Sequence, residues 1–191
     1  MERIQKTSHY LLAVFNILLI ALPLWNLTQW IFIETKTIDI PDALNFFGML
    51  EQTVKTPEGI VNLSQIERTS SLKIMGVMTG FFGVLPFFLG VLVLKSLFKN
   101  YQRGEIFSLQ NAKHYRQLGW LFFLDALLVQ PLSGMLLVLL ATLSNAPGHR
   151  YISIHFGTPN LEALFCGLLV IVISWVMIEG YRLSENDKFT I

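Results

Sequence analysis

The chain has 191 residues, of which 53% are hydrophobic and 14% charged, and its formal net charge at pH 7 is +1. A mean hydropathy of +0.54 is typical of a chain whose main solvent is lipid, which leaves little length for a soluble domain. The small net charge argues against direct nucleic-acid binding, and a single cysteine, Cys166, excludes a disulfide framework or a Cys-rich metal site within one chain.

Four apolar runs dominate the sequence. A bilayer core about 30 Å thick is crossed by about 20 apolar residues in a helix, and we predict spans at about residues 9–33, 72–97, 119–143 and 161–181. The first run begins like a signal peptide, but it is too long for one and no small-x-small cleavage site follows it, so we predict a retained helix. The predicted fold is all-α: a polytopic membrane protein with a four-transmembrane-helix bundle, forming one domain over residues 1–191.

The distribution of basic residues predicts the orientation. The segment around loop 98–118 has one acid, Glu105, and five bases: Lys95, Lys99, Arg103, Lys113 and Arg116. Loop 144–160 has only Arg150. Because excess Lys and Arg stay on the cytoplasmic side, we expect loop 98–118, both termini and the tail 182–191 inside, with loops 34–71 and 144–160 outside. The expected location is a bacterial inner membrane.

The outer loop 34–71 contains three local signals. Pro41 precedes a stretch whose apolar spacing predicts a short helix, and Thr56-Pro57-Glu58-Gly59 predicts a turn. Ser64 and Glu67 match a capping box, which predicts that the second helix begins outside the membrane.

The second span contains glycines at 76, 80, 83 and 90. Gly76 and Gly80 form a small-xxx-small pair, and together with Gly83 they permit close helix packing. Packing within the chain is the commoner use of such residues. A homodimer seam is the alternative, and residue size does not decide between them.

Asp125 is the one acid deep inside a predicted span, because Glu162 and Glu179 fall at the two ends of the fourth span. An unpaired charge there costs at least a few kcal/mol, so we expect Asp125 to have a partner or to be protonated. Gln130, followed by Pro131, predicts a kink or polar contact in the same helix. Such groups more often stabilise the packing of helices through polar contacts, and a proton or ion pathway is the alternative.

No catalytic or cofactor motif is present in the sequence. The histidines at 9, 114, 149 and 155 have no metal-ligand spacing, and no HExxH motif, P-loop or Ser-His-Asp ordering occurs. We therefore expect no enzyme activity, no metal and no cofactor.

The cytoplasmic loop contains the clearest signal outside the spans, because Ser108 is a suitable N-cap for a helix that continues into the third span. Its basic residues could serve only to attract anionic lipid, and the alternative is a docking surface for a cytoplasmic partner. The candidate partner-binding residues are Arg103, Phe107, Asn111, Lys113, His114, Arg116, Asn186, Asp187, Phe189 and Ile191.

Two short stretches resemble a known family. Gly104-Glu105-Ile106-Phe107-Ser108 leads into Asn111-Ala112, and the fourth predicted span runs into Glu179-Gly180 and ends with Glu185-Asn186-Asp187 and Thr190-Ile191. This pattern resembles the bacterial four-span membrane family known as domain of unknown function twenty-nine seventy-five, whose members pair a G-x-(V/I)-F-(S/T) stretch with an end like E-N-D-L-T-I. Lys188 and Phe189 stand where that tail usually has one aliphatic residue.

The resemblance implies the same topology and no established activity. Family members are often encoded beside a compact helix-turn-helix protein, which implies a small regulatory pair. The leading hypothesis is a non-enzymatic membrane protein that binds or sequesters a cytoplasmic helix-turn-helix regulator. The alternatives are a small transporter or channel subunit of several copies with Asp125 in a polar path, and an accessory subunit of a larger membrane complex.

Overall fold

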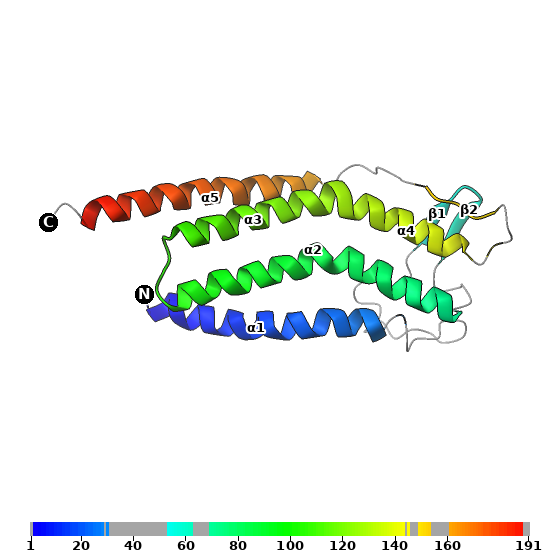
Figure 1. Cartoon of the computed structure of the whole chain (residues 1–191), viewed down its shortest axis with the longest axis horizontal. Coiled ribbons are helices and arrows are strands. Elements are labelled where there is room, and N and C mark those ends of the chain that lie inside the picture. The colour runs from blue at the N-terminus through cyan, green and yellow to red at the C-terminus, as the bar shows by residue number, and fades with distance from the viewer. Residues whose placement is uncertain are drawn as a thin grey trace. The chain divides into compact units, whose positions relative to one another are not determined.

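The computed structural model describes residues 2–28, 30, 53–62, 69–143, 145, 149–153 and 161–188. Within them lie four helices long and apolar enough to cross a membrane: Ile4–Leu27, Ser70–Gln102, Leu109–Thr142 and Leu161–Asn186. Figure 1 shows these helices as the main elements of the chain. The predicted fold class, a polytopic all-α membrane protein with four spanning helices, is confirmed.

The spans are built from five α-helices: α1 (Glu2–Leu27), α2 (Ser70–Gln102), α3 (Leu109–Leu124), α4 (Gln130–Thr142) and α5 (Leu161–Lys188). The third span comprises α3, a π-helical segment (Asp125–Val129) and α4. The π-helical segment comes just before Pro131, near the predicted kink. Proline has no N–H to donate and its ring crowds the preceding turn, so a locally widened helix accommodates it.

A β-hairpin, which the sequence analysis did not predict, flanks the predicted turn. Strand β1 (Thr53–Thr56) pairs antiparallel with β2 (Gly59–Asn62), with Val54 opposite Val61. Val54 is buried in an apolar cluster with Leu72 and residues of α4. Two such short strands are marginal alone, so packing on the helices stabilises them. The helix predicted after Pro41 and the capping box at Ser64 and Glu67 lie outside the described residues.

The chain groups into two compact units, and the single domain over residues 1–191 stays a prediction. Unit 1 contains residues 1–22, 85–128 and 158–191, and unit 2 contains residues 23–84 and 129–157. In unit 1, α1 packs on α2 through the rings of Phe15 and Phe98, whose centroids lie 5.5 Å apart. Figure 1 shows α5 running along α3 in this unit.

Helices α3 and α5 approach each other at a pair of glycines. A Cβ added at Gly119 would lie 2.8 Å from the Gly167 carbonyl oxygen, and a Cβ added at Gly167 would lie 3.0 Å from the Gly119 carbonyl oxygen. Backbone therefore contacts backbone at this crossing, as in small-residue packing between membrane helices.

In unit 2, the predicted packing glycines of α2 face other parts of the same chain. An added Cβ at Gly76 would overlap the Trp30 ring, one at Gly80 would overlap the Asn26 amide, and one at Gly83 would lie 3.2 Å from Ser133 Oγ. Asn26 is buried and donates to the Val77 carbonyl at 3.0 Å. These three glycines therefore face other residues of the same chain, and the choice between intramolecular packing and a homodimer seam stays a prediction.

A polar cluster joins the hairpin turn to residues 149–151 in unit 2. Tyr151 Oη donates to Glu58 Oε1 at 2.8 Å, and His149 Nδ1 lies 2.5 Å from the same oxygen. The His149 hydrogen bond, and next the Tyr151 hydrogen bond, lower the pKa of the Glu58 carboxyl, while the Glu58 bond raises the pKa of the Tyr151 hydroxyl. The charged form of Glu58 is therefore favoured in the folded chain.

Glu58→Gln is expected to remove a pH-dependent contribution to folding stability. Because the folded-state pKa of Glu58 is lowered, its contribution is present above its ordinary pKa of 4.5 and disappears as the pH falls through the lowered value. The unfolding temperature of the wild type in detergent should exceed that of the variant at neutral pH, and the difference should shrink in acid. Glu162→Gln, at an exposed position of α5, is the control. A difference that stays constant through the acid range would contradict this prediction.

Candidate functional site: the link between α2 and α3

The link of residues 103–108 begins with a tight turn after α2. Gly104 has a φ of +83°, the left-handed region that side chains disfavour. The N–H groups of Arg103 and Glu105 both donate to the Asn100 carbonyl at 3.0 Å, and the Gly104 N–H donates to the Tyr101 carbonyl. These bonds satisfy carbonyls at the end of α2 and set the direction of the link.

The link ends at the cap of α3. Ser108 has an extended backbone, and its side chain accepts a hydrogen bond of 3.1 Å from the Asn111 N–H. The predicted N-cap is confirmed. This cap satisfies one of the N–H groups that the first turn of a helix leaves without a partner.

Asn111 holds the link in place from inside. Its side chain is 0% exposed; Nδ2 donates to the carbonyls of Glu105 at 2.6 Å and Ile106 at 2.9 Å, and Oδ1 accepts from Asn100 Nδ2 at 2.8 Å. The Asn111 amide is therefore used within the chain, and the prediction that Asn111 binds a partner stays a prediction.

The link and the start of α3 also contact the end of α5. Ser174 Oγ donates to the Ala112 carbonyl at 2.8 Å, and a Cβ added at Gly180 would lie 2.8 Å from the Phe107 ring. The absence of a side chain at Gly180 therefore lets Phe107 lie against α5. We call residues 103–112 together with Ser174 and Gly180 the clasp.

The clasp explains the motif residues that carried the family resemblance. Gly104 allows the turn, Ser108 caps α3, Asn111 binds the link carbonyls and Gly180 receives Phe107. Asn100, Ser174 and Gly167 were not singled out from the sequence. The signal available for Ser174 was a polar residue in the middle of an uncharged run, which usually faces another helix.

The other predicted partner-binding residues are distributed around the clasp. Arg103, Lys113, Arg116 and Asn186 are exposed, and Phe107 is 54% exposed. His114 is half-buried, with Nδ1 3.2 Å from Gln117 Oε1. The Asp187 side chain, Phe189 and Ile191 lie outside the part of the chain that the structure describes.

The predicted intramembrane polar residues lie along the third span. Asp125 is half-buried and begins the π-helical segment, and its N–H donates to the carbonyls of Leu121 and Phe122. Gln130 is exposed at the start of α4. Among the described residues, no group of three His, Cys, Asp or Glu side chains could hold a metal ion.

Comparison with known protein families gives a match. The family model described as "Protein of unknown function (DUF2975)" matches residues 60–191, a range that includes all of the clasp. No curated protein matches the chain, and no solved structure matches it.

Proposed function

The chain belongs to the DUF2975 family of proteins of unknown function, and from the clasp we propose that it binds a cytoplasmic transcription regulator at the membrane. The proposed role is non-enzymatic: the protein would hold a small helix-turn-helix partner on one membrane face. The proposed location is a bacterial inner membrane, with both termini in the cytoplasm.

The observation that carries this proposal is a hydrogen-bonded link with exposed apolar side chains on it and beside it. Phe107 is 54% exposed, Leu109 47% and Leu183 59%. Phe107 lies against Gly180, and Leu183 is one helical turn further along the same side of α5. Exposed apolar side chains beside cations are typical of protein–protein interfaces, in which arginine is enriched. We call Arg103, Phe107, Leu109 and Leu183 the docking surface.

The charge around the docking surface supports a cytoplasmic position. Arg103, Lys113 and Arg116 are exposed near the link, and Glu105 is the acid among them. An excess of cations in a short loop is retained on the cytoplasmic side. A partner that docks here would therefore meet the protein from the cytoplasm.

The test is co-fractionation with a helix-turn-helix protein encoded beside this chain, a neighbour that the family resemblance leads us to expect. We expect wild-type membranes to retain that protein, whereas the double variant Phe107→Asp with Leu183→Asp should release most of it into the soluble fraction. Deletion of residues 185–191 should also release it, because the tail follows the docking surface directly. Ile152→Asp is the control, because Ile152 is 69% exposed and belongs to unit 2, whereas the clasp belongs to unit 1. Equal retention by all four membranes would overturn the proposal.

A further inference from the structure

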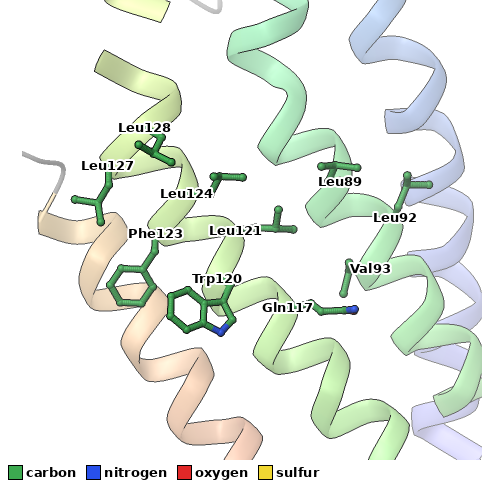
Figure 2. Close-up of a pocket in the computed structure, with 10 residues that line it drawn as sticks. All are labelled: Leu89, Leu92, Val93, Gln117, Trp120, Leu121, Phe123, Leu124, Leu127 and Leu128. Atoms are coloured by element: carbon green, nitrogen blue, oxygen red, sulfur yellow. The ribbon is translucent and has the colours of Figure 1, made fainter. Parts of the chain in front are cut away.

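A groove in unit 1 lies between α2 and the third span. It has a volume of about 740 Å³ and is lined by three residues of α2 and seven residues of α3 and the π-helical segment: Leu89, Leu92, Val93, Gln117, Trp120, Leu121, Phe123, Leu124, Leu127 and Leu128. Figure 2 shows Gln117 and Trp120 at one end of the groove and Leu127 and Leu128 at the other. Its volume lies within the range of about 300–1,000 Å³ that is typical of ligand sites.

The length and lining of the groove match one leaflet of a bilayer. From Gln117 to Leu128 the helix rises about 16 Å, and one leaflet contributes about half of a hydrocarbon core that is about 30 Å thick. All lining residues are apolar or aromatic except Gln117, which lies at the end next to the link. A ligand that fills the groove is therefore apolar along its length and polar at the Gln117 end.

The same end of the groove is flanked by cations. Lys113 and Arg116 lie one turn before Gln117 and Trp120 on α3, and Lys99 lies two turns beyond Leu92 on α2. All three side chains are exposed, and within the described part of the chain none forms an ion pair. Long basic side chains can extend along apolar surface and place their charge at the headgroup level.

We propose that this groove binds one acyl chain of an anionic phospholipid, whose phosphate lies among Lys99, Lys113 and Arg116. The occupant is a lipid of the surrounding bilayer, because the groove combines leaflet length, an apolar lining and positive charge at one end only. A second protein helix would satisfy the apolar lining but would not require the three cations. The inference is independent of the proposed regulator, because it concerns lipid alone.

The test is native mass spectrometry of the purified full-length protein with dioleoyl phosphatidylglycerol or dioleoyl phosphatidylcholine added in detergent. We expect one phosphatidylglycerol per chain, bound at least about tenfold more tightly than phosphatidylcholine, since each cation near an anionic headgroup contributes about fivefold in affinity. Replacing Lys99, Lys113 and Arg116 by glutamine should abolish this preference. Replacing Lys6, Lys55 and Arg150 by glutamine, all at exposed positions, should leave it unchanged.

A groove-filling variant tests the acyl-chain site separately. Leu92 and Leu124 are 39% and 40% exposed, so Leu92→Trp with Leu124→Trp should fill the groove without disturbing the core, and it should reduce the bound lipid at least about tenfold. Equal binding of the two lipids by the wild type would overturn the proposal. The proposal would also be overturned if the groove-filling variant bound as much lipid as the wild type does. A wild-type dimer that this variant converts to a monomer would overturn it as well, because a second copy would then cover the groove.

Discussion

Gly167→Leu is expected to be among the most destabilising single substitutions in this protein. A Cβ added at Gly167 would lie 3.0 Å from the Gly119 carbonyl oxygen and 3.1 Å from Phe122 Cβ, and neither atom is the free end of a flexible side chain. Leucine must therefore push α5 away from α3. Overpacking of this kind costs about 1–3 kcal/mol or more. Thermal unfolding in detergent should show a large decrease in the unfolding temperature.

Gly134→Leu provides the matched control for this substitution. Gly134 is also a glycine within an apolar helix, but a Cβ added there has no atom within 4 Å. Because leucine has the higher helix propensity, this control should unfold at the wild-type temperature or above it. If the two leucine variants were equally stable, the close crossing of α3 and α5 would be refuted.

Asn111→Leu is expected to have the second large effect, because it removes the side chain that holds the link. The carbonyls of Glu105 and Ile106 lose their donor and the Asn100 amide loses its acceptor. Each buried polar group left without a partner costs about 1–3 kcal/mol. The unfolding temperature should fall, and the link should become accessible to protease at Arg103.

Asn111→Asp separates hydrogen bonding from side-chain size. Aspartate can still accept from Asn100, but it cannot donate to the two carbonyls and would place a negative charge against them. It should therefore be no more stable than the leucine variant. Gln110→Leu, at an exposed neighbouring position of α3, is the control. If it lowered the unfolding temperature as much as Asn111→Leu does, the role of Asn111 in holding the link would be contradicted.

The sequence predicted the four spans and the Ser108 cap because each depends on local information. The length of an apolar run can be read directly from the sequence and predicts a span, and an N-cap involves residues only a few positions apart. The hairpin was missed because Val54 is held by residues distant in sequence, including Leu72 and Val138. Only tertiary packing makes these two short strands stable.

The faces of the helices could not be predicted from hydropathy. In a membrane both the lipid-facing and the packed sides of a helix are apolar. The sequence around Gly119 and Gly167 therefore has no hydrophobic periodicity that would predict the helix crossing there. The hydrogen bonds of Asn111 could not be predicted from the sequence either, because the turn at Gly104 brings two carbonyls of the link to its amide.

Most of the docking surface lies on the clasp, so the proposed function depends on the contact between Phe107 and Gly180. Phe107→Cys with Gly180→Cys, in a chain whose exposed Cys166 is replaced by alanine, should be joined efficiently by a short thiol cross-linker in native membranes. Phe107→Cys with Leu161→Cys is the control pair, because Leu161 lies about 28 Å along α5 from Gly180. Cross-linking of the first pair and not of the second is the predicted result. Failure of the first pair, or equal reaction of both, would contradict the clasp and the docking surface built on it.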